Sequence, residues 1–255
     1  MMGVEAERRR AGVPRSVVAA IAIAWAIAIA AEATGNASKL HHDALIHSTL
    51  PLWIALAIFV VAWQVMVAAM MLPSSIPMLR LFRATSRSQP EHTKAMTAFV
   101  GGYIVVWAVF GAVAFLGDFM LHHVVDRTPW LAGRPWIISA GVLAIAGAFQ
   151  FSPLMEKCLT ECRHPASFIV QRYARGSAAA FRLGREHGQF CLGCCWALML
   201  LMFAVGVANL WWMAALAALM AYEKVGKHGE EVARIAGLAL IAGAVLVALM
   251  GASLS

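Results

Sequence analysis

Apolar segments of about 17–25 residues constrain this fold more than any other feature, because a helix needs that length to cross a bilayer. Of the 255 residues, 62% are hydrophobic and only 13% are charged, and the mean hydropathy is +0.75. This balance argues against a soluble domain of the same size. The sequence predicts an all-α, polytopic transmembrane helical bundle of about six spans, at 14–33, 51–72, 96–117, 135–152, 191–213 and 234–253.

The first predicted span follows a basic segment, as a signal peptide does, but it has no clear small-x-small cleavage site. We therefore expect a retained first helix. The predicted organisation is a cytoplasmic N-terminal tail at 1–13 and a single transmembrane helical domain at 14–253. The domain would carry a cysteine-containing cytoplasmic loop at about 153–190.

Lysine and arginine counts orient the predicted bundle. Fourteen of the 20 basic residues lie before residue 16 or in the connections at about 73–95 and 153–190. Positive charge stays on the cytoplasmic side of a membrane, so both termini are predicted in the cytoplasm. The lipid bilayer is thus a predicted partner. The net charge of +7 does not indicate nucleic-acid binding, because the basic residues sit between apolar spans.

All five cysteines lie on the predicted cytoplasmic side, within 158–195. A reducing cytosol argues against structural disulfides there, and an odd number leaves no complete pairing. Cys158 and Cys162 are four residues apart, so on a helix they share one face. We expect reduced thiols at the membrane edge, able to bind a metal; ordinary buried packing residues are the alternative.

The last three cysteines open the predicted fifth span. Cys191 and Cys195 continue into Met199 and Met202 at spacings that place all four on one helical face. Cys194 lies beside this stripe and makes a C-x-x-C with Cys191. The pattern predicts that Cys191 and Cys195 matter more for metal binding than Cys194 does.

A third segment brings sulfur to the same level of the membrane. The second span ends in "WQVMVAAMMLPSSIPM", with Met66 and Met70 four residues apart. Thiolate and thioether donors together favour Cu(I), because soft ligands select soft ions; zinc is the alternative metal. In the same stretch, Pro73 and Pro77 are predicted to end or kink the helix.

Histidines form a second group on the predicted outer side. His41, His42, Asp43 and His47 lie in the first outward connection, and a further histidine pair lies at 122–123. Imidazole and carboxylate ligands suit Cu(II) or Zn(II), but exposed loop histidines are more often solvated. The sequence leaves these two interpretations open.

Two histidines and three polar positions near the predicted membrane edges complete the expectations. His164 and His187 lie in the predicted cytoplasmic loop, where either could assist the thiols. Asn209, inside the predicted fifth span, is interpreted as a polar contact between helices. Glu223 and Lys224 are expected to mark an interfacial boundary rather than a site.

Several motifs taken together resemble a bacterial family of predicted metal-binding integral membrane proteins. They are "WQVMVAAMMLPSSIPM", "GGYIVVW", "FQFSPLMEKCLTECRHP" and "GREHGQFCLGCCWALMLLMFAVGVANLWWM", between about residues 51 and 225. The resemblance implies about six helices in a bacterial inner (plasma) membrane, and copper-chaperone activity for copper-dependent oxidases in some members. It also implies that the metal-site positions are Cys158, Cys162, Cys191, Cys194, Cys195, Met70, Met71 and Met199.

The function predicted on these grounds is a Cu(I) chaperone rather than an enzyme. It would capture Cu(I) as a thiolate complex and pass it at or across the membrane to a copper-dependent oxidase or another cuproprotein. One alternative is a membrane thiol–disulfide oxidoreductase that uses the C-x-x-C, although it would prefer cysteines on the oxidising side. The other alternative is a structural assembly subunit.

Overall fold

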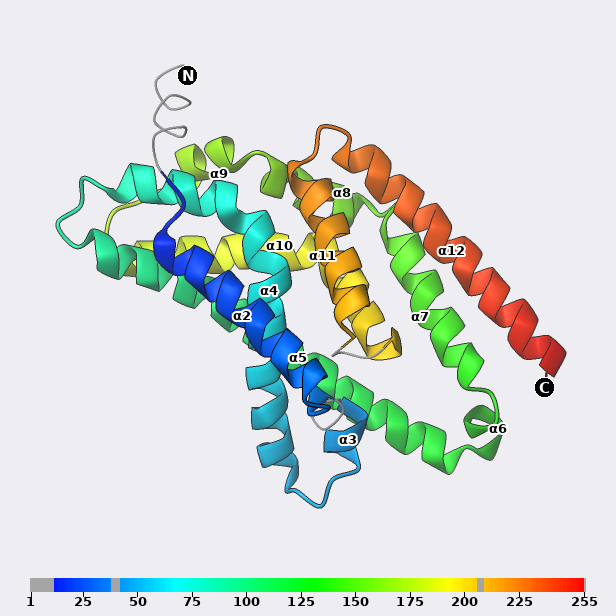
Figure 1. Cartoon of the computed structure of the whole chain (residues 1–255). Coiled ribbons are helices and arrows are strands. Elements are labelled where there is room, and N and C mark those ends of the chain that lie inside the picture. The colour runs from blue at the N-terminus through cyan, green and yellow to red at the C-terminus, as the bar shows by residue number, and fades with distance from the viewer. Residues whose placement is uncertain (1–11, 38–41, 206–208, 255) are drawn as a thin grey trace.

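The computed structural model describes residues 12–37, 42–205 and 209–254. In these ranges the chain forms helices and no strand, which confirms the predicted all-α bundle (Figure 1). The helices are α2 (Arg15–Ala33), α3 (His42–Ile46), α4 (Leu52–Ser86), α5 (His92–Arg127), α6 (Pro129–Ala132), α7 (Pro135–Phe149), α8 (Pro153–Arg163), α9 (Pro165–Arg172), α10 (Ser177–Val205), α11 (Leu210–Val225) and α12 (Gly229–Leu254).

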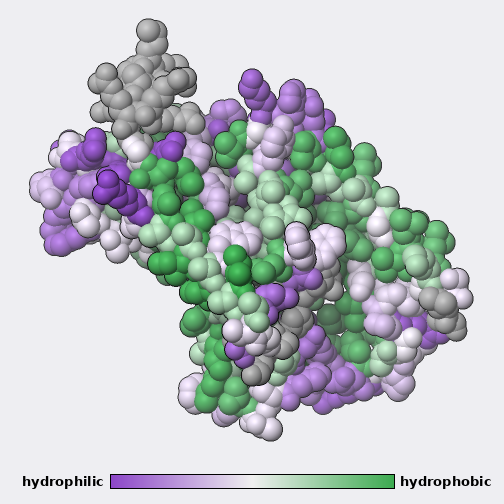
Figure 2. Space-filling view, in the orientation of Figure 1, coloured by the Kyte–Doolittle hydropathy of each residue, from purple (hydrophilic) through white to green (hydrophobic). Residues whose placement is uncertain are grey.

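Five of these helices are long and apolar enough to cross a membrane: α2, α4, α5, α10 and α12. The pair α7 and α8 passes the same test together, but the chain bends by 61° between them, so it counts as one broken span. Figure 2 shows hydrophobic residues over much of the visible face, between hydrophilic groups toward the upper and lower ends. The described part of the chain therefore has five helical segments suited to a bilayer, or six if the bent pair is one span.

Helix α4 does not end at the two prolines, which was one of the two outcomes predicted for them, and it extends beyond the predicted span at 51–72. It continues through Pro73 and Pro77 to Ser86. Proline has no N–H and cannot donate to the carbonyl four residues earlier, which for Pro73 is that of Ala69. The indole Nε1 of Trp25 in α2 donates to this carbonyl at 3.1 Å. A neighbouring helix thus satisfies the freed backbone group, as the apolar interior requires.

Replacing Trp25 with phenylalanine should lower the free energy of unfolding by roughly 1 kcal/mol, because the Ala69 carbonyl loses its donor. In the Pro73→Ala background the loss should be smaller, because a residue with an N–H at position 73 can donate to that carbonyl itself. Thermal unfolding in detergent measures both. Trp53→Phe is the matched control, since Trp53 is 71% exposed. Equal losses in the two backgrounds would contradict this account.

The predicted cytoplasmic loop at about 153–190 is mostly helical. It forms α8, α9 and the first half of α10. Helix α10 lies against α5 at very close range, because added Cβ atoms at Gly102 and Gly184 would collide with the backbones of Phe181 and Phe99. Small residues at such a crossing let two helices approach closely. Helices α5 and α10 therefore run side by side and in the same direction.

A second hydrophobic core lies past the end of the predicted second span and around the start of the predicted third span. It joins the end of α4, the start of α5, α9 and the start of α10, through buried side chains such as Phe82, Phe99 and Phe168. The rings of Phe82 and Phe99 stack at 4.6 Å. We call this region the collar, meaning residues 78–99 and 165–183. It is held together by packing of its own.

The predicted fifth span at 191–213 is wrong. Helix α10 ends at Val205 and a separate helix, α11, begins at Leu210. Asn209 is the N-cap of α11, its side chain accepting a hydrogen bond from the backbone N–H of Trp212 at 3.2 Å. Asn209 is therefore a capping residue and not the contact between helices that the sequence suggests. This break lets α11 run back through the bundle beside α4 (Figure 1).

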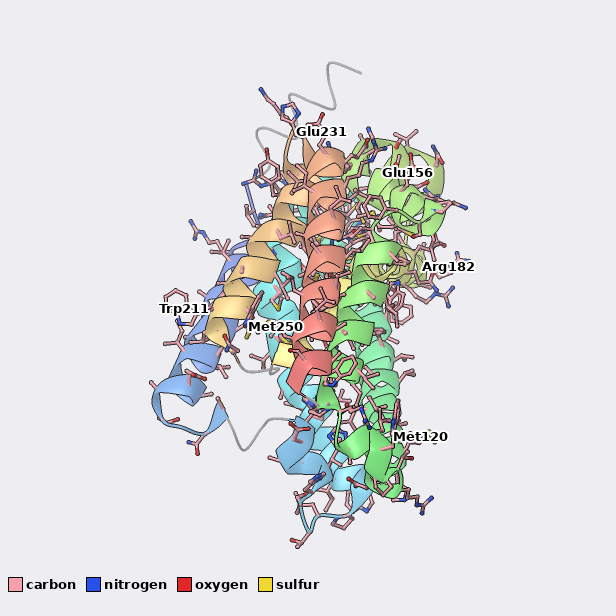
Figure 3. The ribbon with its side chains drawn as sticks, turned by 90° about the vertical axis from the view of Figure 1, so that its right-hand side faces the viewer. Met120, Glu156, Arg182, Trp211, Glu231 and Met250 are labelled. Atoms are coloured by element: carbon pink, nitrogen blue, oxygen red, sulfur yellow. The ribbon has the colours of Figure 1, made fainter. Side chains whose placement is uncertain are left out.

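The turn between α11 and α12 lies at the same end of the bundle as α8. The guanidinium of Arg163 at the end of α8 donates to the carbonyls of Glu223 at 2.6 Å and Lys227 at 3.5 Å. Figure 3 places Glu231 of α12 and Glu156 of α8 at this end, and Met250 of α12 well toward the end that carries Met120 of α5. Helix α12 thus starts beside α8 and runs away from it.

The two ends of the described chain consequently lie at opposite ends of the bundle. Gly12 accepts a hydrogen bond from Arg83, near the collar. Gly251, by contrast, lies against Trp136 in the first turn of α7. This differs from the prediction that both termini share one side. It also moves three basic residues from the predicted outward side to the α8 end: Lys224, Lys227 and Arg234.

Candidate metal centre

Three sulfur atoms converge on one buried position between α4, α10 and α11. The Sγ of Cys195 lies 3.7 Å from the Sδ of Met71. The ammonium of Lys224 lies 3.1 Å from the Sγ of Cys191 and 4.0 Å from each of the sulfurs of Cys195 and Met71. All four side chains are at most 6% exposed. We call Cys191, Cys195 and Met71, with Lys224 among them, the sulfur centre.

Polar groups from α4 and α5 complete the surroundings of Lys224 and Cys191. The hydroxyl of Tyr103 lies 3.2 Å from the Sγ of Cys191, and Lys224 donates to the Oγ of Ser74 at 3.4 Å. Tyr103 directly follows Gly102, whose lack of a side chain brings α5 against α10. The "GGY" sequence therefore positions a hydroxyl beside the first cysteine.

The remaining cysteines form a second group on the side of α8. Cys194 lies near both Cys162 of α8 and Cys195 of its own helix. Cys158 lies against Gly193, where a Cβ atom would meet its sulfur. Cys194 is buried, whereas Cys162 is only partly so. The structure therefore brings all five cysteines together, with Cys191 and Cys195 beside Met71 and with Cys194 next to both Cys195 and Cys162.

The other predicted methionines lie in the same core as the thiols. Met70 and Met199 are fully buried and belong to the hydrophobic cluster that contains the sulfur centre. No hydrogen bond joins either residue to a cysteine in the described part of the chain. Buried methionines of α4, α10 and α11 share this cluster: Met66, Met70, Met71, Met199, Met202, Met213 and Met220.

The two predicted helper histidines have different positions. His187 is buried, its Nε2 lies 3.3 Å from the Oγ of Ser75, and its ring stacks on Tyr103 at 5.7 Å. It thus supports the tyrosine that touches Cys191. His164 is exposed and bonds to the backbone carbonyl of Thr160 at 2.8 Å, away from the sulfur centre.

Lys224 is the main functional residue that sequence reasoning missed. The boundary role predicted for it is wrong, because its Nζ lies inside the bundle among sulfurs. The error follows from the undetected break at Asn209, since a continuous span at 191–213 leaves residue 224 outside the bundle. An asparagine N-cap three residues before Trp212 was the available signal. Tyr103 and Ser74 were missed for want of any local pattern.

The sulfur centre has the donors of a soft-metal site. Two cysteine sulfurs and one thioether from two helices surround a position that a cationic group already occupies. Closed zinc sites in proteins are usually four-coordinate and built from thiolate and imidazole, whereas here one of three donors is a thioether. Thiolate and thioether ligands select Cu(I). The arrangement can bind a small number of soft cations and exchange them with the lysine ammonium.

A family model described as PpoB2, copper chaperone, matches residues 60–247. No curated protein and no solved structure matches the chain. The matched range is more than half of the chain and contains all five cysteines, Met70, Met71, Met199 and Lys224. It also agrees with the predicted resemblance to a family with copper-chaperone-like members. The chain therefore belongs to the PpoB2 copper chaperone family.

Proposed function

We propose that this protein is a membrane chaperone that holds Cu(I) on Cys191, Cys195 and Met71 and passes it to a copper-dependent partner such as an oxidase. The observation that carries the proposal is the convergence of three sulfurs on one buried position between helices. Copper is the cargo here, so the site has to release it as well as bind it. A site with few ligands, one of them a neutral thioether, suits such transfer.

Entry of the cargo is proposed through the second cysteine group. Cys162 at the end of α8 is partly exposed and contacts Cys194, which sits one helical turn from Cys191. Copper moves between sulfurs by ligand exchange, one bond forming as another breaks. The Cys162–Cys194 pair would therefore hand the ion from the α8 side to the sulfur centre. Buried methionines deeper in the core, such as Met70 and Met199, would offer the next ligands.

Lys224 is proposed to act as a tethered cation that the cargo displaces. Its ammonium, at 3.1–4.0 Å from the three sulfurs, would balance the charge of a cysteine thiolate in the absence of copper. An unpaired buried thiolate would be costly in this apolar setting. When copper leaves, the ammonium would return and neutralise the thiolate charge. The lysine would therefore lower the free-energy cost of copper release.

The membrane arrangement proposed is a bacterial inner membrane with the N-terminal tail, the collar and the α11–α12 turn in the cytoplasm. Moving Lys224, Lys227 and Arg234 to the α8 end leaves, among the described residues, Arg127 and Arg134 at the other end. That bias supports the assignment. The single transmembrane domain stays as predicted, but the C-terminal end of α12 is now proposed on the outer side.

Reporter fusions test this topology. Fusions at residues 85, 175 and 227 should report cytoplasm, while fusions at residue 127 and after the last residue should report the outside. The C-terminal fusion separates this arrangement from one with both termini in the cytoplasm. A cytoplasmic report from both residue 127 and the C-terminus would contradict the proposed membrane orientation.

The identity of the cargo is tested by anaerobic titration of purified, reduced protein with Cu(I) and Zn(II). We expect Cu(I) to bind more tightly, because of the thioether ligand. Met71→Leu keeps the volume and removes the third sulfur, so it should weaken Cu(I) binding and leave Zn(II) binding unchanged. Met250→Leu, on the 64% exposed Met250, is the control. Zinc binding that is tighter than copper binding and survives Met71→Leu would refute the Cu(I) assignment.

A further inference from the structure

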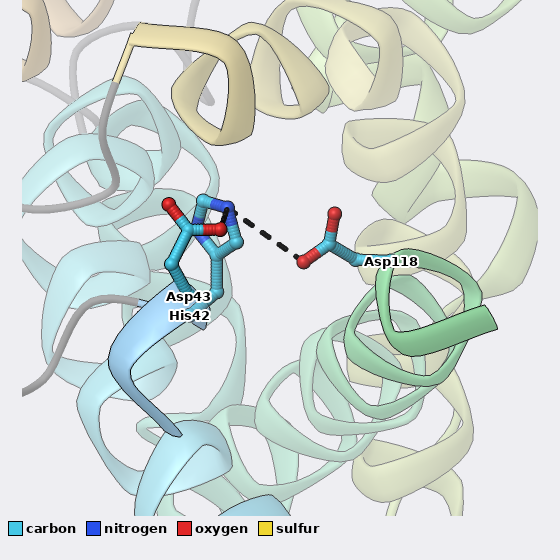
Figure 4. A group of neighbouring side chains, drawn as sticks. All are labelled: His42, Asp43 and Asp118. Carbon is cyan, nitrogen blue, oxygen red and sulfur yellow. Dashed lines mark ion pairs between the residues drawn. The ribbon is translucent and has the colours of Figure 1, made fainter. Parts of the chain in front are cut away.

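A second group of ligand-type side chains lies at the opposite end of the bundle from α8. We call His42, Asp43, Asp118 and His122 the outer His–Asp cluster. The Nε2 of His42 lies 3.1 Å from the Oδ1 of Asp43 and 3.6 Å from the Oδ2 of Asp118 (Figure 4). The Nε2 of His122 lies 2.9 Å from the same Oδ1 of Asp43. Four side chains from α3 and α5 thus share one small volume.

The cluster gathers ligand-type atoms within reach of a single ion and shields part of them from water. Ligand atoms of His42, Asp43 and Asp118 all lie within 4.8 Å of one another. His42 is only 3% exposed, and the side chain of Asp118 is 11% exposed. The ring of Phe203 in α10 packs on that of His42 at 5.0 Å. A carboxylate so shielded from water needs a compensating cation or hydrogen bonds.

The donor set selects a class of ion. The two imidazoles offer nitrogen donors and the two carboxylates offer oxygen donors. When both carboxylates are ionised and both imidazoles are neutral, the cluster carries a charge of about −2, which a divalent cation balances. Such ligands suit Cu(II) and Zn(II), and Cu(II) stands highest in the affinity order of divalent first-row ions. None of the four side chains contains sulfur, so the cluster does not share the preference of the sulfur centre for Cu(I).

We propose that the outer His–Asp cluster binds a divalent transition-metal ion, with Cu(II) bound most tightly. The sequence alone suggested a group of His41, His42, Asp43 and His47. Of these, His41 lies outside the described residues, and the ring of His47 is 5.6 Å from that of His122. The structure brings His122, one of the histidine pair already noted at 122–123, to this group and adds Asp118 from α5. The inference does not depend on Cu(I) binding at the sulfur centre.

The test uses the full-length protein in detergent with Cys191 and Cys195 replaced by serine, which limits reduction of Cu(II) by thiols. Cu(II) is titrated and followed by electron paramagnetic resonance, with thermal unfolding as the folding check. We expect one bound Cu(II) with nitrogen coupling, and a loss of affinity of about ten-fold or more in Asp43→Asn and His42→Ala. Asp43 is half exposed, so its variant should fold normally.

His123→Ala is the matched control, because His123 neighbours His122 on α5 but is exposed and stacks only on Phe119 among the rings of the described chain. It should leave Cu(II) binding unchanged. A parallel Zn(II) titration of the otherwise wild-type chain involves no reduction, and His42→Ala should remove one zinc equivalent there while His123→Ala should not. Cu(II) binding that survives Asp43→Asn together with His42→Ala, or no binding at all, would overturn the proposal.

Discussion

Cu(I) affinity should fall by roughly 100-fold or more when Cys191 and Cys195 are both replaced by serine, because two of the three sulfurs of the sulfur centre are lost. Loss of a residue that merely supports a ligand already costs about 10–100-fold in metal affinity, so removal of two ligands should cost at least as much. The measurement is competition with a Cu(I) chelator under anaerobic conditions. Thermal unfolding of the same samples separates lost ligands from lost folding.

Two single variants sharpen this prediction. Cys158→Ser changes a buried cysteine that lies against Gly193 on the side away from Met71, so affinity should hardly change. Cys194→Ser should slow the loading of copper, because it breaks the Cys162–Cys194 pair, but should leave the equilibrium affinity largely intact. If Cys194→Ser abolished binding and Cys195→Ser did not, the C-x-x-C and not the Met71 side would be the site.

Release of Cu(I) should slow by about ten-fold or more in Lys224→Gln. The ammonium and the copper ion carry the same charge, and the ammonium sits 3.1–4.0 Å from all three sulfurs, so the two cannot share the position. Unit charges 4 Å apart interact by roughly 4 kcal/mol at an effective dielectric constant of 20. A ten-fold change corresponds to about 1.4 kcal/mol, well within that range. Stopped-flow transfer to a chelator measures the rate.

The control for Lys224 is Ser74→Ala, which removes only a neutral partner of the ammonium. It should change the release rate little. Faster release from Lys224→Gln would show the reverse role, in which the lysine helps to hold the thiols in their ionised, copper-binding form. In that case Lys224 would be a positioning residue for Cys191 and not a competitor of the cargo.

The sequence was sufficient for the helical class and for the gathering of the cysteines. Span length and hydropathy depend on local composition, which the chain displays directly. The spacing of Cys191 and Cys195 was equally local, and their common face follows from helical periodicity. Both kinds of information survive without knowledge of which helices are neighbours.

Features that depend on chain reversal or on distant contacts could not be read in this way. The break before Leu210 changes the direction of the chain that follows it. The residues around the break are nonetheless as apolar as those of a continuous span, so hydropathy does not reveal it. Asp118 meets His42 across 76 positions of sequence, with no periodic pattern joining them. Trp25 donates a hydrogen bond to the carbonyl of Ala69, which Pro73 leaves without a donor, and the two bonded residues are 44 positions apart. Each of these is a tertiary contact between residue types that are common elsewhere.

We expect the collar to influence how copper arrives. Helix α4 has 35 residues and is about 52 Å long, against a hydrocarbon thickness of about 30 Å. In a bilayer, the excess length would carry the end of α4 out of the lipid, together with α9 and the start of α10. The collar holds seven basic side chains and one acidic one. A positive rim of this kind should repel free metal cations and attract acidic proteins, so we expect delivery by an acidic carrier protein to be faster than capture of the free ion.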